Sequence, residues 1–465
     1  MYETIIKHGK QNDVWINDQN RRRRTLKAID FYNTDMWIYL KHRINKMYPT
    51  TGDKVLRYGE TYPLTTRVID GVSVLFQNPV VLDIDKDTLV DDFNLMIKTS
   101  KFQSVMNKVN HYVNLTFKVG VMPVYRDGII DLDIITGDKC FVYQDKLNPT
   151  KATDVFVQID ALDQTPSIEE GHIGNLYVRW TNEVQSIVEI DTESGNIIKE
   201  YNAEVNPYGV IPITWFSDSI STSTFWPEKR NSLIETNEWV NVDQTNINMV
   251  ISFQSYSTLV IVGSDDDSKQ DIQWGPQALI EFKGDNYSGT TPTADYITPD
   301  PKLEQMQKAL EQKKVDAATS FGLSANAYRS DTSQASSGYS LKLMNENLIK
   351  KLQSSRAPYT ASILELLKLM MNVWSYHSTT KVFPEDTIIT VNFPEITYDA
   401  SPLETAQINA IRLSQGLVSP VMLLMEADQD LSRELAQELY IQIQADKRLA
   451  VTNGVAKLTD AVLNT

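Results

Sequence analysis

Residues 301–321 read PKLEQMQKALEQKKVDAATSF, and this segment carries the clearest structural pattern in the chain. Proline is favoured in the first turn of a helix, so a helix is expected to begin at Pro301. The apolar side chains fall on one helix face: Leu303, Met306, Leu310, Ala317 and Phe321. This stripe is narrow, and charged residues surround it. A narrow stripe predicts a helix that packs side by side with like helices rather than one inside a globular core.

The residues upstream of this helix have a different period. A helix is expected over 229–253, and hydrophobic runs at 258–262 and 278–282 predict two short strands. An acidic turn, Asp265-Asp266-Asp267, lies between those strands. A loop rich in glycine, threonine and proline is expected over 284–300. The order is therefore helix, small β insert, helix.

Downstream of Phe321 comes a long linker of small polar residues, 322–340. Linkers of this length inside a compact protein are usually functional or disordered. A long helix is expected over 341–376, and Pro358 inside it should kink it. A strand is predicted at 387–393.

The last part of the chain has strong helix-end signals. Ser401-Pro402 and Ser419-Pro420 each place a capping residue before proline, which predicts a helix start. Gly416 should end the first of these helices. A further helix is expected over 431–445.

The N-terminal segment Asp18–Tyr48 is helical by its apolar spacing and locally basic, with four consecutive arginines, Arg21 to Arg24. The favoured interpretation of the arginines is a solvated helix face. The alternative is contact with nucleic acid or with an acidic neighbouring subunit. Further helices are expected over 67–79, ending at Asn78-Pro79, and over 89–115.

Between residues 116 and 216 the spacing changes to that of strands. Asp127-Gly128 between two alternating runs predicts a hairpin, and residues 191–196 predict a second one. With the helices on either side, this region predicts an α+β fold that is predominantly helical.

The composition limits the possible classes. The 465 residues, 52.8 kDa, suffice for two to four domains. A hydrophobic fraction of 42% and a charged fraction of 22% are ordinary for a folded protein. The sequence has no apolar run long enough to cross a bilayer, no secretory signal, and only one cysteine, Cys140. A net charge of −16 is the opposite of the basic footprint of a simple nucleic-acid binder.

The patterns that accompany catalysis are missing. The sequence contains neither a phosphate-binding glycine loop nor a zinc-protease or serine-hydrolase motif, and its five histidines are scattered. The acidic run Asp83–Asp87 opens like a calcium loop, but Thr88 stands where glycine is needed and Asn94 where a bidentate Glu is needed. No enzyme activity, no catalytic residue, no metal and no cofactor are therefore expected.

Four stretches, taken in order, resemble the portal proteins of tailed viruses, the siphophage-type head-to-tail connectors. Residues 67–79 resemble the early helix and its Leu-Phe-Gly-x-Pro exit, with Gln77 in place of Gly. Residues 206–216 resemble the Asn-x-x-Gly-x-Ile-Pro segment before the stem. Residues 336–341 resemble the Ser-Gly-x-Ala-Leu start of the long helix, with Ser340 in place of Ala. Residues 403–438 resemble the C-terminal crown.

The resemblance implies a portal fold with wing, stem, clip and crown, assembled into a ring of twelve subunits around a central channel. The implied parts are the wing (1–225), the first stem helix (226–255), the clip (256–300), the second stem helix (301–321), the tunnel loop (322–340), a kinked wing helix and strand (341–400), and the crown (401–465).

The resemblance also implies three sets of site residues. The tunnel loop would offer DNA-channel residues: Asn326, Tyr328, Arg329, Ser330, Asp331, Thr332, Ser333 and Gln334. The stem would present lysines to the channel: Lys302, Lys308, Lys313 and Lys314. The clip would contact terminase and then connector proteins: Asp265, Asp266, Asp267, Lys269 and Trp274. For any single lysine, an ordinary pair within the helix is the favoured interpretation.

The implied function is a channel for packaging and ejecting double-stranded DNA, located at the portal vertex of the capsid and assembled in the host cytoplasm. The implied partners are copies of the same chain, the major capsid protein, the large terminase subunit, a head–tail adaptor or connector, any scaffold protein and the passing DNA, with no membrane. Acidity suits such a conduit, because twelve copies at −16 each would carry −192 and would repel DNA.

Two alternatives from other classes stay open at this stage. The first is a capsid or tail structural protein that never conducts DNA. The second is a nucleic-acid-processing enzyme, such as a packaging ATPase or a nuclease, against which the missing motifs argue.

Overall fold

The computed structural model describes residues 11–145, 147–159, 174–191, 195–219, 224–227, 232–254, 258–264, 279–283, 293–297, 302–325, 346–378, 383–384, 386–394, 409–427 and 431–446. The chain divides into two compact units. The first comprises Met1–Thr332 and Asn345–Glu395, and the second comprises Ser333–Met344 and Ile396–Thr465. Among the described residues, none of the helices combines the length and apolar character that a bilayer crossing requires.

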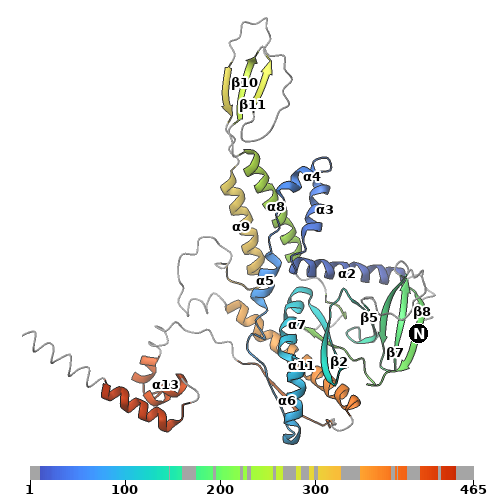
Figure 1. Cartoon of the computed structure of the whole chain (residues 1–465), viewed down its shortest axis with the longest axis vertical. Coiled ribbons are helices and arrows are strands. Elements are labelled where there is room, and N and C mark those ends of the chain that lie inside the picture. The colour runs from blue at the N-terminus through green and yellow to red at the C-terminus, as the bar shows by residue number, and fades with distance from the viewer. Residues whose placement is uncertain are drawn as a thin grey trace, which may run out of the picture. The chain divides into compact units, whose positions relative to one another are not determined.

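The N-terminal part of the first unit is helical (Figure 1). Its helices are α2 (Gln11–Tyr32), α3 (Trp37–Met47), α4 (Gly52–Val55), η1 (Leu56–Tyr58), α5 (Leu64–Val72), η2 (Asp87–Leu89), α6 (Val90–Thr99) and α7 (Phe102–Thr116). The prediction of one helix over 89–115 was wrong, because Lys101 adopts a left-handed conformation (φ 52°) and separates α6 from α7. The helix expected over 67–79 ends earlier than predicted, at Val72, although Phe76 beyond it is still buried.

Two antiparallel sheets follow. The first consists of β2 (Lys118–Arg126), β3 (Ile129–Ile135) and β9 (Thr214–Ser217), in the order β3-β2-β9. The second is a meander of β4 (Cys140–Gln144), β5 (Ala152–Gln158), β6 (Gly174–Trp180), β7 (Val184–Asp191) and β8 (Ile197–Val205). Both predicted hairpins are confirmed. At the first, Asp127 and Gly128 both have positive φ, at 51° and 84°, as a tight two-residue turn requires.

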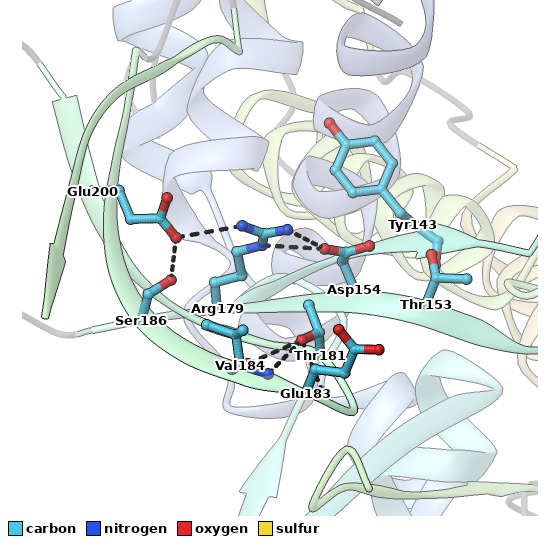
Figure 2. Close-up of polar contacts among 9 residues, drawn as sticks. All are labelled: Tyr143, Thr153, Asp154, Arg179, Thr181, Glu183, Val184, Ser186 and Glu200. Carbon is cyan, nitrogen blue, oxygen red and sulfur yellow. Dashed lines mark hydrogen bonds and ion pairs between the residues drawn. The ribbon is translucent and has the colours of Figure 1, made fainter. Parts of the chain in front are cut away.

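A polar cluster ties together strands β5 to β8 of the five-stranded sheet (Figure 2). Arg179 on β6 donates from Nε and Nη2 to Asp154 on β5, at 3.1 and 2.8 Å. Its Nη1 reaches Glu200 on β8 at 3.3 Å, and the Ser186 hydroxyl donates to the same carboxylate at 2.6 Å. Because Arg179 is largely buried, this network fixes the relative positions of β5, β6 and β8.

Helix α2 is anchored to this sheet by the first two arginines of the basic run. Arg21 donates to the carbonyls of Gly137 and Cys140 at 2.8 and 2.9 Å, and its guanidinium lies 3.9 Å from the Trp226 ring centre. Arg22 donates to the carbonyl of Asp138 at 2.7 Å, and also to a tyrosine hydroxyl and a glutamine. For these two residues both sequence interpretations were wrong, because the guanidinium groups satisfy backbone carbonyls at the edge of the sheet.

The long helix α11 (Glu346–His377) runs through the core of the first unit, and Pro358 lies inside it as predicted. Its buried face carries Tyr359, Ile363, Leu366, Leu367, Met370 and Val373. Side chains buried to this extent contribute about 1.5–3 kcal/mol each. Tyr359 meets Phe76 edge to face at 5.5 Å, and its hydroxyl donates to Asn110 at 3.2 Å. The predicted last strand is β13 (Ile389–Asn392), which pairs antiparallel with β1 (Val81–Ile84).

The middle of the chain forms a helix, a small sheet and a second helix, in the predicted order. These elements are α8 (Leu233–Gln254), β10 (Thr258–Ser264), β11 (Leu279–Lys283), β12 (Thr293–Ile297) and α9 (Leu303–Ser320). The sheet order is β11-β10-β12, with β10 parallel to β11 and antiparallel to β12. The interpretation of residues 284–300 as a loop missed β12.

The second unit contains short helices at 409–414, at α13 (Pro420–Ala427) and at 433–446. Gly416 ends the first of these with φ 68°, and the Ser419 hydroxyl accepts from the backbone N–H of Met422 at 3.2 Å, so both predicted signals are confirmed. Arg412 holds Glu426 through two hydrogen bonds of 2.8 and 2.9 Å. The predicted helix start at 401–402 lies outside the described residues.

Candidate functional site: the α8–α9 helix pair

One face of α8 carries a row of short polar side chains: Asn237, Asn241, Thr245 and Asn248. Residues spaced by three or four positions lie above one another on a helix, so this row forms a continuous stripe. The stripe binds the backbone of residues 58–65, which cross it. Asn237 accepts the N–H of Thr65 at 2.9 Å and donates to the carbonyl of Tyr62 at 2.8 Å. Asn241 accepts the N–H of Tyr62 at 2.8 Å.

The same row continues toward the end of α8. Thr245 accepts the N–H of Glu60 at 3.4 Å, and Asn248 donates to the Glu60 carboxylate at 2.7 Å. Asn237, Asn241 and Thr245 are fully buried. A buried polar group that loses its partner costs about 1–3 kcal/mol, so these bonds specify how residues 58–65 lie on α8. We call residues 237, 241, 245 and 248 the amide row.

A second side of α8 contacts α2 and α3. The buried carboxylate of Glu238 accepts from Lys27 of α2 at 3.0 Å and lies 3.5 Å from the guanidinium of Arg43 of α3. That guanidinium also lies 4.5 Å from the ring centre of Trp239. A small apolar cluster of Leu40, Ile44, Val55 and Val242 completes this contact. Two cations around one buried carboxylate compensate the cost of burying its charge.

Helix α9 packs on α8, and Figure 1 shows α3 and α9 on opposite sides of α8. The predicted apolar stripe is confirmed, with Leu310, Ala317 and Phe321 buried and Leu303 and Met306 half-buried. Val315 and Ala318 are also buried, so the apolar face is wider than the sequence pattern indicated.

The four lysines predicted for a channel face have different surroundings. Lys313 pairs with Asp243 of α8, and Lys308 pairs with Glu304 at 2.6 Å one turn away. Lys314 is half-buried with its ammonium 3.8 Å from the ring centre of Tyr62, and burial lowers its pKa. Lys302 is exposed. Each residue turns a helix by about 100°, so Lys314 lies on a different side from Lys313, and the four cannot share one face.

The outer face of α9 is polar apart from Ala309. Its exposed residues include Glu304, Gln305, Gln307, Lys308, Gln312, Lys313, Asp316, Thr319 and Ser320. Gln312 donates to Asp316 at 2.6 Å, so uncharged and charged groups alike are paired along this face. No large apolar side chain of α9 is exposed among the residues described for that helix. Such a surface is well hydrated and offers few unpaired charges.

The end of α9 is fixed by a left-handed glycine. Gly322 has φ 86°, its N–H donates to Thr319 at 2.9 Å, and the N–H of Leu323 donates to Ala318 at 3.1 Å. This pair of bonds is the Schellman arrangement that terminates helices. Leu323 then packs against Gly71 of α5, where a Cβ would lie 3.1 Å from Leu323 Cδ1. The first residues of the predicted tunnel loop are therefore anchored to the helical part of the first unit.

Two predicted sets of site residues lie outside the described residues. They are the tunnel-loop residues Asn326, Tyr328, Arg329, Ser330, Asp331, Thr332, Ser333 and Gln334, and the clip residues Asp265, Asp266, Asp267, Lys269 and Trp274. Their roles stay predictions. Within the described part of the chain, no three His, Cys, Asp or Glu side chains gather as a metal site would require.

Sequence reasoning missed the amide row and the Glu238 contacts. The row does leave a signal, because three asparagines and a threonine recur at helical spacing inside a segment that also contains Val240, Val242 and Ile247. What that stripe binds could not be read from the sequence.

Two solved assemblies contain chains similar to this one. A chain in the virion of a native gene transfer agent particle matches with a TM-score of 0.42 and 10% identity, covering 80% of this chain and 91% of that chain. A chain in the neck of an empty gene transfer agent particle matches with a TM-score of 0.41 and 10% identity, covering 80% of this chain and 92% of that chain. No protein-family model and no curated protein matches the sequence. Likeness at this distance does not by itself assign a function.

Proposed function

We propose that this chain is the subunit of a viral portal, a ring of about twelve copies that conducts double-stranded DNA at one vertex of a capsid. The observation that carries the proposal is the α8–α9 pair, in which two packed helices are joined through a separate three-stranded sheet and the outer face of α9 is polar apart from Ala309. A helix pair of this kind can line a water-filled passage when copies stand side by side.

The charges on α9 support the proposal. A conduit must let DNA slide, and each phosphate neutralised by a free cation adds affinity through counterion release. Lys308 and Lys313 already have carboxylate partners, and Lys314 lies against Tyr62. Three of the four lysines are compensated within the chain in this way, and a surface with so few free cations holds a polyanion weakly, as sliding requires.

The remaining parts of the proposal follow the family resemblance. The ring would sit in the virion at the portal vertex, with the major capsid protein around it and a scaffold where one exists. The β10–β12 sheet would face the terminase large subunit and later a head–tail connector. The proposal assigns no catalytic step and no cofactor to the chain.

Electron microscopy of the purified full chain, with native mass measured on the same sample, tests the proposal. Rings of about twelve subunits with a central hole are expected. Because some rings close only with scaffold or shell, the chain is also to be co-expressed with the capsid and scaffold genes of its virus. A chain that stays monomeric under both conditions, or that hydrolyses ATP or cuts DNA, would overturn the portal assignment.

A capsid or tail protein that never meets DNA is the remaining alternative. It would assemble into particles or tubes without a DNA-filled passage. Particles assembled with and without the chain would separate the two, because only a portal should be required for DNA to enter a finished shell.

A further inference from the structure

Strands β1 and β13 form a two-stranded antiparallel ribbon. The register places Ile84 opposite Ile389. The N–H of Asp85 donates to the Ile388 carbonyl at 3.1 Å, so the pairing continues one residue beyond the two strands. In the part of the chain that the structure describes, neither strand has a second neighbouring strand. A two-stranded ribbon is marginally stable by itself, and a third strand would stabilise it.

The outer edge of β1 carries backbone groups that do not bond to β13. Successive residues of an antiparallel strand point their N–H and C=O groups alternately toward the partner strand and away from it. Because Asp85 bonds toward β13, the backbone of Asp83 also faces β13, and the backbone groups of Leu82 and Ile84 point outward. Among the described residues, these outward groups form no hydrogen bond. Such an edge can pair with an extended segment of another molecule.

The side chains of the ribbon separate into two faces, because successive side chains of a strand point to opposite sides. One face is exposed along its whole length and consists of Val81, Asp83, Asp85, Ile388, Thr390 and Asn392. The opposite face is half-buried or buried, with Leu82, Ile84, Ile389 and Val391. On the exposed face, Val81 is 52% exposed and Ile388 65%. We call Val81, Asp83 and Asp85 the β1 row.

The β1 row lies in the most acidic stretch of this part of the chain. Residues 83–92 contain five aspartates and one lysine, Lys86, whose ammonium pairs with Asp386 at 3.1 Å. Asp85 accepts the N–H of Ile388 at 2.9 Å, whereas Asp83 forms no ion pair or side-chain hydrogen bond with any residue that the structure describes. Nor do three carboxylates converge there as a metal site requires, within the described residues. The acids are spaced for a row of cations.

We propose that β1 is a docking edge for an extended, basic segment of a partner protein, which adds antiparallel as a third strand of the ribbon. Its backbone would bond the outward groups of Leu82 and Ile84. Its lysine or arginine side chains would lie opposite Asp83 and Asp85, in the positions where the side chains of an antiparallel pair are closest. Their apolar stems would cover Val81. The proposal goes beyond the portal assignment and does not depend on it.

The distribution of charge selects this occupant and this edge. Duplex DNA and anionic bilayers would be repelled by the aspartates. Another copy of the chain has a net charge of −16, so it meets the edge with like charge, whereas a basic segment meets it with opposite charge. The exposed residues on the other strand of the ribbon, Ile388, Thr390 and Asn392, are uncharged and would not select a basic segment.

A binding experiment with the full chain tests the proposal. The probe is a fluorescein-labelled peptide of alternating valine and lysine, followed by fluorescence polarisation. A valine–glutamate peptide is the charge control. The backbone control is a valine–lysine peptide methylated on its valine nitrogens. Lysines opposite Asp83 and Asp85 place valines opposite Leu82 and Ile84, so the valine N–H groups are those that would bond to β1.

Two charge reversals form a matched pair of variants. Asp83→Lys changes the β1 row, and Glu204→Lys makes the same change at an exposed position of β8, the edge strand of the five-stranded sheet. The valine–lysine peptide should bind the unaltered chain and Glu204→Lys equally, and Asp83→Lys about tenfold more weakly or worse. Circular dichroism confirms that each variant is folded.

Hydrogen exchange on the unaltered chain gives a second measurement that needs no variant. With the valine–lysine peptide bound, the amides of Leu82 and Ile84 should exchange more slowly, because a third strand would bond them. The glutamate peptide and the N-methylated peptide should leave their exchange unchanged.

Four outcomes would overturn the proposal. The first is a failure of the valine–lysine peptide to bind the unaltered chain, or equal binding to the two variants. The second is binding of the N-methylated peptide as tightly as the unmodified one, or unchanged exchange at Leu82 and Ile84. The third is thermal stabilisation by calcium that Asp83→Lys abolishes, which would show a cation site instead. The fourth is loss of self-association in Asp83→Lys alone, which would show that another copy of the chain covers this edge.

Discussion

The side-chain oxygen of Asn237 accepts both the backbone N–H and the hydroxyl of Thr65, at 2.9 and 2.8 Å, and both residues are fully buried. This one amide joins α8 to the first turn of α5, which begins at Leu64. The contact consists of hydrogen bonds, which depend on the direction of the groups as well as on their distance. It lies where the proposed stem helix α8 meets the rest of the first unit.

Replacing this amide should be costly. Asn237→Leu removes the acceptor for Thr65 and the donor for the Tyr62 carbonyl, so at least two buried polar groups lose their partner. We expect the free energy of unfolding to fall by about 3 kcal/mol, measured by urea denaturation. Asn94→Ala, at an exposed position of α6, serves as the control and should change it by less than about 0.5 kcal/mol. Equal effects of the two substitutions would contradict a structural role for the amide row.

The arginine run offers a matched pair within one helix. Arg21→Ala leaves the carbonyls of Gly137 and Cys140 without their donor and removes the cation beside the buried Asp18 carboxylate. We expect a loss of about 3 kcal/mol in thermal or chemical denaturation. Arg24→Ala, which removes only an exposed side chain bonded to the Asn20 carbonyl, should cost about 0.5 kcal/mol or less. If the two variants were equally stable, the docking of α2 described above would be wrong.

Lys118 should make stability depend on pH in the alkaline range. Burial lowers its pKa to about 8, although its ammonium donates to the Phe225 carbonyl at 2.8 Å. In the unfolded chain the group keeps its ordinary pKa near 10.4, so between these values the unfolded state binds more protons. Stability from this group therefore rises as the pH increases from about 8 to 10.4, and the folded state bears the cost of the buried charge below that range.

Other groups also titrate at high pH. Comparing the unaltered chain with Lys118→Met isolates the part of the pH dependence of stability that comes from Lys118. The difference in unfolding free energy should shift by about 2–3 kcal/mol in favour of the unaltered chain between pH 7 and pH 10. A difference that stays constant over that range would show that Lys118 keeps an ordinary pKa in the folded state.

Gly322 is expected to tolerate only residues that accept a left-handed backbone. At φ 86°, a residue with a Cβ is strained by about 1–2 kcal/mol. Asparagine adopts this region more readily than β-branched residues. The free energy of unfolding, measured by denaturation, should therefore be highest for the unaltered chain, lower for Gly322→Asn and lowest for Gly322→Val. A valine variant as stable as the asparagine variant would contradict the φ assigned to this position.

The sequence predicted those parts of the fold that depend on local chemistry. The Asp127-Gly128 turn, the helix end at Gly416 and the stripe on α9 are encoded within a few residues of where they act. The break at Lys101 was not predictable, because lysine is a good helix former, yet here it takes a left-handed backbone between α6 and α7. Strand β12 was missed because glycine, threonine and proline around it are typical of a loop.

The candidate site was predictable in outline only. The helix–sheet–helix order could be read from spacing, yet the partners of its polar residues could not. Glu238 binds cations that lie about two hundred residues away in the chain, and Asn237 binds a backbone segment almost as distant. Contacts of this kind depend on the tertiary fold, and hydrophobic periodicity contains no information about them.

The amide row has a consequence for temperature. Contacts between apolar surfaces weaken on cooling, because their hydration carries a large positive heat capacity of unfolding. Exposing polar surface changes the heat capacity in the opposite direction. The contact between α8 and residues 58–65 consists of hydrogen bonds from amide side chains to backbone groups. Its contribution to stability should therefore persist at low temperature, while that of neighbouring apolar contacts decreases.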